Sequence, residues 1–588
     1  MKTRSYSSIL VTTLSALAIP LSGAAAHEHH HYKLIDLGTF GGPTSYFSNG
    51  FDGILNNSGT AVGWADTPMP DPHPASCVNP DCFVAHAFQS RNGVLADLGA
   101  LPGGGSSQAV MVSTNGLVAG VSQIAEIDPS LPGGPAEVRA VLWRNGVAID
   151  LGVLPQGGFD TLAFAVNSRG QVVGWGLDAI TDPFSLQAPG FFTTQTRAFL
   201  WEGGVMHDLG TLGGADAAAA LVNEQGQIVG ISYTNSSPNL VTGVPTVDPF
   251  LWENGTMVDL GTLGGTSGSP SALNNRGEVV GQSNLAGDLT SHPFLWTKTG
   301  GMQDLGTLGG NNGLTNWIND AGAIAGKADL PGPLPQNHDA VLWRHGSMID
   351  LGTLPGDSCS NAYYVNSRGQ VLGTSESRDL CLLPTGEHAF LWEGGGPMVD
   401  LNSLIAPGSG LELTFAFSIN NHGEIIGIGV PSGCAPENIE FCGHAYVLIP
   451  CDESHPGVEG CDYSMTDAVD RIPAIPARPE AAPSQAASAM STTTTPVISS
   501  FTARVCAIFI VCGGGVKLIL TATVTSVAPI ADVQFFVNGR LYRTLTHGPF
   551  QVWVTPNARQ EFFKVTATDV DGGTASKSIT CVGPKCSP

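Results

Sequence analysis

The sequence predicts an all-β protein in which eight small antiparallel sheets close into a β-propeller, followed by a linker and a β-sandwich. Three observations predict this fold. A set of motifs recurs eight times, turn-forming residues separate short apolar runs, and the two ends of the array are incomplete. The chain has 588 residues, of which 76 are Gly and only 12% are charged. This length requires several domains or a repeat array, and this composition is typical of short strands joined by tight turns.

The first recurring element is Asp-Leu, followed by Gly in all but the last copy. Most copies continue into a Gly-rich corner, such as Gly-Thr-Leu-Gly-Gly at residues 210–214. Because the Asp recurs in every copy, we expect it to cap the corner and not to form a catalytic or calcium site. The eight copies are Asp36, Asp97, Asp150, Asp208, Asp259, Asp304, Asp350 and Asp400.

Two further elements complete each copy. Asn-x-x-Gly, followed by one residue, two aliphatic residues and Gly, occurs at residues 167–174, and a small residue with Phe-Leu-Trp occurs at 198–201. Asn and Gly tolerate positive φ, so Asn-x-x-Gly predicts a hairpin turn between strands. One unit then holds about four strands in roughly fifty residues, the size of a propeller blade. The turn Asn residues are Asn56, Asn167, Asn223, Asn274, Asn319, Asn366 and Asn420, with Ser113 in the second copy.

The ends of the array predict its closure. The first Asp-Leu-Gly, at Asp36, is preceded only by the strand-like run 32–35, whereas the last run, 444–449, has no Asp-Leu-Gly after it. Pairing these two halves would remove both exposed sheet edges, whereas an open solenoid would need polar capping repeats. The sequence therefore favours a closed ring over residues 27–450.

Together the three motifs resemble the extracellular repeat family named for its His-Ala-Phe (HAF) motif, over about residues 32–450. His86-Ala87-Phe88 and His388-Ala389-Phe390 match that motif completely. Other copies have Arg139, Arg197, Asp248 or Asp339 in place of the His. The resemblance implies an exported protein, and it implies no agreed activity and no catalytic residues.

The N-terminus predicts secretion. Lys2 and Arg4 precede the apolar run 9–21, and Ala24 to Ala26 supply the small residues of a cleavage site. Residues 1–26 therefore read as a signal peptide, and no later segment is long and apolar enough for a membrane helix. We expect a secreted or cell-surface protein with no membrane span.

The 12 cysteines predict disulfides, because their number is even in a chain expected to be exported. Zinc binding is disfavoured, since the Cys-x-x-Cys spacing is absent. Pairing of neighbours is one hypothesis, and a crossed pattern within the last four is equally compatible with the sequence. The neighbours are Cys77 and Cys82, Cys359 and Cys381, Cys434 and Cys442, Cys451 and Cys461, Cys506 and Cys512, and Cys581 and Cys586.

The composition changes after residue 450. Residues 451–496, rich in Pro, Ala, Ser and Thr towards their end, predict a linker. Residues 497–588 alternate apolar and polar residues at 516–525 and carry hairpin signals at Asn538-Gly539 and Asp571-Gly572. The run 533–539, with the segments 548–550 and 566–569, resembles bacterial immunoglobulin-like modules. Asp569-Val570-Asp571-Gly572 resembles part of a calcium loop but has no downstream Glu, so a hairpin turn is favoured.

The net charge of −25 argues against nucleic acid as a partner. We expect no cofactor, metal ligand or catalytic residue, although the cluster 27–31 (His-Glu-His-His-His) leaves open a choice between a metal site and a polar tail. The leading hypothesis is a non-enzymatic protein that binds or adheres to an extracellular glycan or protein through the loop-rich face. The alternatives are a secreted polysaccharide- or peptide-degrading enzyme with paired carboxylates in the loops, and a structural envelope protein. The loops concerned are 64–85, 121–138, 175–196, 231–247 and 428–443.

Overall fold

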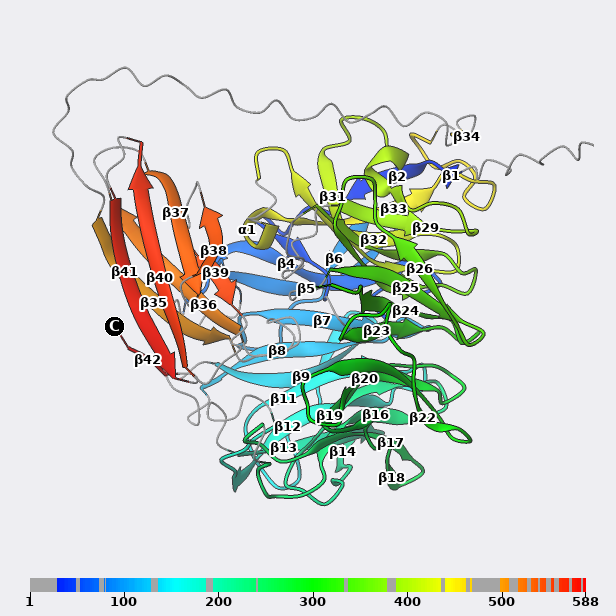
Figure 1. Cartoon of the computed structure of the whole chain (residues 1–588), viewed down its shortest axis with the longest axis vertical. Helices are drawn as coiled ribbons and strands as arrows, with labels where there is room; N and C mark the ends of the chain where they lie inside the picture. The colour runs from blue at the N-terminus through cyan, green and yellow to red at the C-terminus, as the bar shows by residue number, and fades with distance from the viewer. Residues whose placement is uncertain are drawn as a thin grey trace, which may run out of the picture.

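The structure is a computed structural model (Figure 1). Between residues 29 and 461 it describes all but 49–52, 73–78, 80, 128–135, 187–193, 240–241, 333–336, 378–387 and 435–438. Beyond them it describes 466–467, 497–506, 517–525, 530–537, 540–545, 551–554, 560–570, 574–582 and 585–587. The predicted signal peptide lies outside the described residues.

The chain is nearly all β, with 58% strand and 2% helix, which confirms the predicted class. The two helical segments among the described residues are short: the 3₁₀ helix η1 (Leu401–Leu404) and the helix α1 (Ile439–Cys442). Within the described residues, no helix has the length and apolar character that a membrane crossing requires.

Residues 32–450 form eight antiparallel units of four strands, and within units 1 to 7 the strands follow one another in chain order. Units 1 and 2 are β3 (Ser45–Tyr46), β4 (Thr60–Pro70), β5 (Phe83–Arg91) and β6 (Val94–Asp97), then β7 (Ser107–Val112), β8 (Val118–Ile127), β9 (Ala136–Arg144) and β10 (Val147–Asp150). Units 3 and 4 are β11 (Thr161–Val166), β12 (Val172–Thr181), β13 (Thr194–Glu202) and β14 (Val205–Asp208), then β15 (Ala217–Val222), β16 (Ile228–Tyr233), β17 (Val247–Glu253) and β18 (Thr256–Asp259).

Units 5 to 7 repeat this order. Unit 5 is β19 (Gly264–Leu273), β20 (Val279–Leu285), β21 (Ser291–Thr297) and β22 (Gly301–Asp304). A single parallel bridge between Val247 and Ser267 joins it to unit 4. Units 6 and 7 are β23 (Gly313–Ile318), β24 (Ile324–Asp329), β25 (His338–Arg344) and β26 (Ser347–Gly352), then β27 (Cys359–Val365), β28 (Val371–Glu376), β29 (His388–Trp392) and β30 (Val399–Asp400).

Unit 8 combines the two ends of the array. Its strands are β31 (Leu411–Ile419), β32 (Ile425–Pro431) and β33 (His444–Pro450), completed by β2 (Tyr32–Asp36) from the N-terminus. Tyr32 pairs with Pro450 and Asp36 with Tyr446, in antiparallel register. The strand pairing that the sequence predicts between the first and last copies is therefore present.

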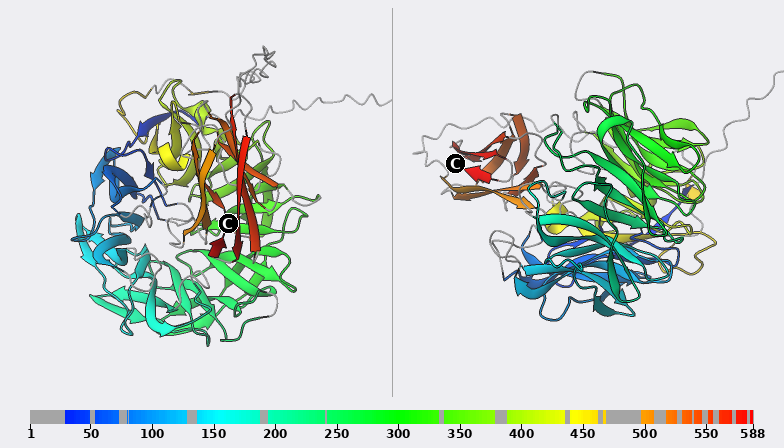
Figure 2. Two further views of the ribbon diagram at one scale, coloured as in Figure 1. Left: turned by 90° about the vertical axis from the view of Figure 1, so that its left-hand side faces the viewer. Right: turned by 90° about the horizontal axis from the view of Figure 1, so that it is seen from below.

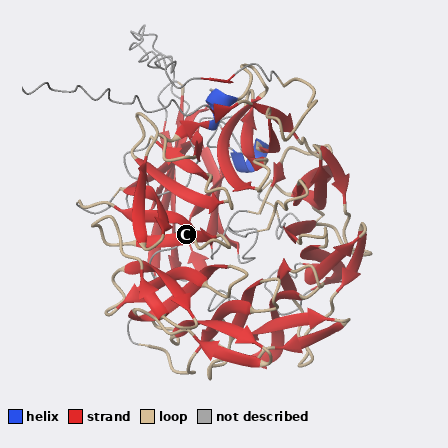
Figure 3. Cartoon of the chain, turned by 90° about the vertical axis from the view of Figure 1, so that its right-hand side faces the viewer, coloured by secondary structure: helices blue, strands red, loops and turns tan. Residues whose placement is uncertain are grey.

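Apolar packing links each unit to the next and the eighth to the first. The aromatic residue of the third strand is fully buried in six units, at Phe88, Phe199, Phe250, Phe294, Phe390 and Tyr446. One cluster contains Phe47, Ile54 and Phe88 of unit 1 with Ile426 and Val447 of unit 8. Comparable clusters join the other neighbours. The units accordingly follow one another around a common centre (Figure 3).

Close backbone packing explains the Gly that ends the second motif. A Cβ at Gly174 would lie 1.9 Å from the Leu162 carbonyl oxygen and 3.0 Å from the Phe199 ring. The register of β11 against β12 shifts between Ala163 and Ala165, so the first strand bulges toward the second at this point. Any larger residue would push apart the bulge and the buried ring.

Two further antiparallel sheets lie after residue 496 (Figure 2). One consists of β35 (Val497–Cys506), β36 (Lys517–Thr525) and β39 (Gln551–Val554). The other consists of β38 (Arg540–Leu545), β37 (Ile530–Val537), β40 (Gln560–Asp569), β41 (Thr574–Val582) and β42 (Lys585–Ser587). β35 contacts both β40 and β41, so the two sheets pack together. A separate two-stranded sheet pairs β1 (His29–His30) with β34 (Thr466–Asp467).

Candidate functional site

Strand direction divides the features of the eight units between two faces. The strand β6 begins opposite Arg91 at the end of β5 and runs back along it to Asp97, which lies opposite Phe88, so the Asp corner lies at the same end as the β4–β5 loop. We call this side the corner face: it carries the Asp corners and the loops between the second and third strands of each unit. The opposite side, which carries the Asn-x-x-Gly turns, is the turn face.

The recurring Asp caps its own corner in all eight units. In each, a carboxylate oxygen accepts a hydrogen bond from the backbone N–H two residues later, at 2.7 to 2.9 Å. At Asp208 the donor is Gly210, whose φ is +83°. This is an Asx turn, and it confirms the structural role predicted for these residues.

The same Asp also contacts the residue at the His position of the His-Ala-Phe motif. His86 Nδ1 lies 3.0 Å from Asp97, and His292 and His444 make equivalent contacts with Asp304 and Asp36. Arg197 forms a bidentate pair with Asp208. The sequence grouped these positions with packing and turn residues. Their partner lies on the adjacent strand, which the motif alone does not reveal.

In two units an Asp replaces the His of the His-Ala-Phe motif, so its carboxyl group lies beside that of the corner Asp. The pairs are Asp248 with Asp259 and Asp339 with Asp350. Burial raises the pKa of Asp248 to about 6, and the nearby charge of Asp259 adds to the effect. Burial and then Asp350 raise the pKa of Asp339 to about 6 in the same way. At Asp36 burial alone would raise the pKa, but the hydrogen bonds from His444 and the Gly38 amide lower it overall. The corner face therefore carries both cation–carboxylate and carboxyl–carboxyl pairs.

The loops of the corner face hold two further buried carboxyl pairs, which sequence reasoning did not find. Asp66 of β4 meets Asp81, and Asp182 meets Asp216, whose side chain is fully buried between units 3 and 4. Burial raises the pKa of Asp66 to about 9, and Asp81 adds to the shift. No spacing signal marks such pairs, because the partners do not recur at a fixed separation: Asp66 and Asp81 are 15 residues apart, Asp182 and Asp216 are 34 apart.

The Asp182–Asp216 pair predicts a pH dependence of stability. Burial raises the pKa of Asp216 to about 7, against the lowering effect of the Leu186 N–H, and Asp182 raises it further. An unfolded Asp titrates near pH 4, so this carboxyl contributes its full stability below about pH 4 and loses it as the pH rises through about 7. We expect the free energy of unfolding to fall by a few kcal/mol over that range from this group.

Asp182→Asn is expected to reduce this loss, because it removes the carboxyl group that adds to the effect of burial on the pKa of Asp216. The Oδ1 acceptor that Phe184 N uses would be retained. Urea unfolding at about pH 5 and pH 8 tests this: D182N should gain stability over the wild type only at the higher pH. An equal offset at both pH values would contradict a contribution of Asp182 to the raised pKa of Asp216.

The turn face is closed by side-chain amides. Asn420 Nδ2 donates to the Asn56 carbonyl at 3.2 Å, which links unit 8 to unit 1. Each other turn Asn donates in the same way to the turn of the next unit, at 2.9 to 3.2 Å. Unit 2, which has Ser113, uses Asn115 Nδ2 to reach the Ser168 carbonyl at 2.8 Å. We call this set of eight hydrogen bonds the amide girdle.

The girdle corrects the sequence-based explanation of the Asn. Positive φ at these turns belongs to the Gly, as at Gly170 with φ +79°, and none of the turn Asn residues adopts it. Asn167 Oδ1 instead accepts from Arg169 N and Gln171 N within its own turn. The Asn therefore serves through its amide, which satisfies its own turn and joins the neighbouring one.

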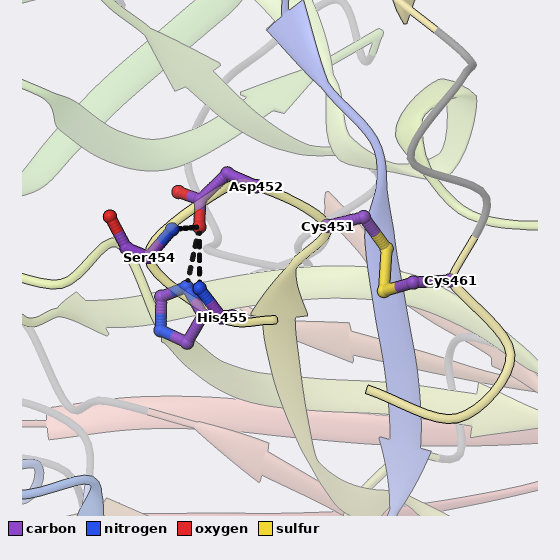
Figure 4. Close-up of a disulfide and its surroundings, with 5 residues drawn as sticks. All are labelled: Cys451, Asp452, Ser454, His455 and Cys461. Atoms are coloured by element: carbon purple, nitrogen blue, oxygen red, sulfur yellow. Dashed lines mark hydrogen bonds and ion pairs between the residues drawn. A yellow bond between two sulfur atoms is a disulfide. The ribbon is translucent and has the colours of Figure 1, made fainter. Parts of the chain in front are cut away.

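Two disulfides lie in unit 8, one in a loop of the corner face and one in the segment that follows β33 and contacts the N-terminus. Cys434 and Cys442 are bonded within the β32–β33 loop, and Cys451 and Cys461 are bonded after β33 (Figure 4). In the second loop Asp452 Oδ1 accepts from Ser454 N at 2.9 Å, and Cys451 N donates to the His31 carbonyl at 2.8 Å. Both bonds join the neighbours that the sequence pairs.

The other cysteines are described in part. Cys82 and Cys359 are disulfide-bonded, and their predicted partners, Cys77 and Cys381, lie outside the described residues. Cys581 and Cys586 stand opposite each other in β41 and β42. The predicted pair of Cys506 and Cys512 is not described, because Cys512 lies outside the described residues.

Among the N-terminal histidines, His29 contacts side chains of unit 7. His29 Nδ1 lies 2.8 Å from Glu393 Oε1, and Gln370 Nε2 donates to the same carboxylate at 2.6 Å. Burial would raise the pKa of Glu393, but these two contacts lower it. His27 and Glu28 lie outside the described residues, as does Asp571 of the calcium-like segment. Among the described residues, no three His, Cys, Asp or Glu side chains form a metal-binding group.

Comparison with known proteins does not assign the chain to a family. The chain matches no protein-family model and none of the curated proteins. The geometry defines a class: an all-β protein with eight four-stranded antiparallel units, in which the loops of the corner face differ from unit to unit and amide hydrogen bonds link the turns of the opposite face.

Proposed function

We propose that the eight units form an eight-bladed β-propeller, closed by β2, and that the protein binds an extracellular ligand through its corner face. The pairing of β2 with β33 and the link from Asn420 to Asn56 support the closure. Each of the three motifs that resemble the HAF repeats has a structural role in the units: the Asp caps the corner, the Asn links neighbouring turns, and the Phe is buried. These roles support assigning residues 32–450 to that family. The two sheets after residue 496 fit an immunoglobulin-like β-sandwich that acts as a spacer or second contact.

The observation that carries the binding function is the contrast between the two faces. On the turn face the same amide hydrogen bond recurs from unit to unit. On the corner face the loops differ in length, and the Cys434–Cys442 disulfide braces one of them. Variable, braced loops on a rigid scaffold are where binding surfaces are found in repeat proteins.

Exposed apolar side chains support this assignment. Met69 and Ile180 lie near the ends of β4 and β12, where these strands reach the corner face, and they are 54% and 51% exposed. Ile127 occupies a similar place at the end of β8. The three residues occupy equivalent places, at the ends of the second strands of units 1 to 3. The disulfides are compatible with secretion, since such bonds persist in oxidising compartments.

An array experiment tests the proposal. The chain without its signal peptide, and a second version lacking residues 497–588, are incubated with extracellular glycans and cell-surface proteins. Both retention and release of products are scored. We expect retention without turnover, and retention by the shorter version if the corner face is the main contact. Product release would instead favour the hydrolytic alternative.

Matched variants locate the surface. Met69→Asp and Ile180→Asp are expected to weaken retention at least about tenfold, the effect of losing about 1.4 kcal/mol of contact. Val94→Asp is the control, because Val94 is 69% exposed at the start of β6, away from the corner face. Loss of retention in V94D, or none in the other two variants, would overturn the assignment of the corner face.

A further inference from the structure

Charge divides the chain into two parts of opposite sign. Residues 27–450 contain 12 Lys and Arg against 38 Asp and Glu, a formal net charge of −26. Residues 497–588, which hold the C-terminal sheets, contain 8 Lys and Arg against 4 Asp and Glu, a net charge of +4. In these sheets Lys564 and Lys577 are exposed, whereas Asp532 is partly buried and Asp569 is 1% exposed. The C-terminal sheets are therefore basic, and the eight units to which the chain joins them are strongly acidic.

Within the eight units the exposed charges separate by face. Every exposed Lys or Arg that the structure describes between residues 32 and 450 lies in or beside a turn of the turn face, where Arg276 and Lys298 pair with Glu278 and Glu253. These residues are Arg91, Arg144, Arg169, Arg276, Lys298, Arg344 and Arg368. The corner face instead exposes six of its eight corner Asp residues: Asp36, Asp97, Asp150, Asp259, Asp304 and Asp350. Among the described residues, no exposed Lys or Arg balances this negative charge.

The chain is long enough to carry the basic sheets to the corner face. β33 ends at Pro450 on the turn face, and β34 pairs with β1, which precedes β2. The 29 residues 468–496 then separate β34 from β35. An extended chain of that length spans up to about 95 Å, roughly three times the length of a ten-residue strand such as β8. β35 can therefore lie on the side of the units opposite β34.

Figures 1 and 2 show the C-terminal sheets on that opposite side. The helix α1 belongs to the β32–β33 loop of the corner face, and in Figure 1 the C-terminal sheets lie on the side of α1, whereas β34 lies on the far side of the units. The view from below in Figure 2 keeps the C-terminal sheets on the same side. The basic sheets thus lie beside the acidic face, although the chain leaves the units from the other face.

We propose that the C-terminal sheets dock on the corner face through charge attraction and cover part of it. The connection within one chain raises their local concentration at the units to about the millimolar range, so an interface of only millimolar affinity is occupied about half of the time or more. Opposite charges supply attraction of this kind and make the contact sensitive to salt. Only the consequence that a ligand competes with the sheets rests on the proposed binding function; the contact itself does not.

Small-angle X-ray scattering of the chain without its signal peptide tests the contact. At about 0.1 M salt we expect a compact particle with the sheets docked. At about 1 M salt the Debye length falls to about 3 Å, and the maximum dimension should grow by at least about 20 Å as the sheets separate from the units. A maximum dimension that does not change with salt would overturn the proposal.

Matched variants test the sign of the charge. Lys564→Glu combined with Lys577→Glu changes the net charge of residues 497–588 from +4 to 0, and this chain should show the larger dimension already at about 0.1 M salt. Lys564→Arg combined with Lys577→Arg keeps the charge and should stay compact. An effect of both pairs, or of neither, would contradict a contact held by charge. The salt series uses the unaltered chain, so it decides the question even if a variant fails to fold.

Carbodiimide cross-linking locates the surface, because the reagent joins a Lys amine to a carboxyl group only where the two are in contact. We expect links from Lys residues of the C-terminal sheets to corner Asp residues such as Asp97 and Asp150. Their yield should fall at least about fivefold at about 1 M salt. Links to carboxylates of the turn face, such as the exposed Glu202, would overturn the assignment to the corner face.

Discussion

A chain that lacks residues 29–37 is expected to lose at least about 5 kcal/mol of its free energy of unfolding. The deletion removes β2, whose Tyr32 and Leu34 are buried in the cluster between units 7 and 8, and it removes Leu37 from the cluster between units 8 and 1. Each large apolar side chain in such a place contributes about 2 to 5 kcal/mol. Since domains are stable by only about 5 to 15 kcal/mol, much of the molecule should unfold.

The matched control lacks residues 29–31 only. It keeps β2 and loses the contact between His29 and Glu393 and the hydrogen bond from Cys451 N to the His31 carbonyl. Its loss should stay near 1 to 2 kcal/mol. Urea unfolding followed by tryptophan fluorescence compares the two chains, and hydrogen exchange of β33 reports the exposed edge. Similar small losses in both chains would mean that closure contributes little.

The features that sequence reasoning predicted are those whose cause is local. The Asp corner depends on a hydrogen bond from a residue to the N–H two positions later, so Asp-Leu-Gly reveals it directly. The pairing of β2 with β33 joins residues at the two ends of the array. It was nevertheless predictable, because each end lacks the half that the other supplies.

Contacts between units were not predictable from the motifs. Asn167 was explained by turn conformation, whereas its amide reaches Asn223, 56 residues away. The buried carboxyl pair in unit 1 has the same difficulty in a stronger form. Asp81 lies in an irregular loop, so no fixed spacing joins it to Asp66. The repeat indicates where strands and turns occur, and it carries little information about side chains that differ between copies.

Asn420→Ala is expected to lower the free energy of unfolding by at least about 3 kcal/mol. The side chain is buried, donates to the Asn56 carbonyl, and accepts from His422 N and Glu424 N at 2.9 and 3.0 Å. Truncation would leave these backbone groups without partners, at about 1 to 3 kcal/mol each. Asn235→Ala is the control, because Asn235 accepts from Ser237 N in an exposed turn, and its effect should stay within about 0.5 kcal/mol.

Comparison with Asn274→Ala shows whether the hydrogen bond between units 8 and 1 contributes as much stability as one between consecutive units. Asn274 makes the same hydrogen bonds as Asn420, but its partner, Asn319, belongs to the next unit along the chain. In a closed girdle the link between the last and first units should be worth as much as any other, so N420A and N274A should cost similar amounts. In an open stack the terminal link would break readily, and N420A would cost much less. Equilibrium urea unfolding of both variants decides between these outcomes.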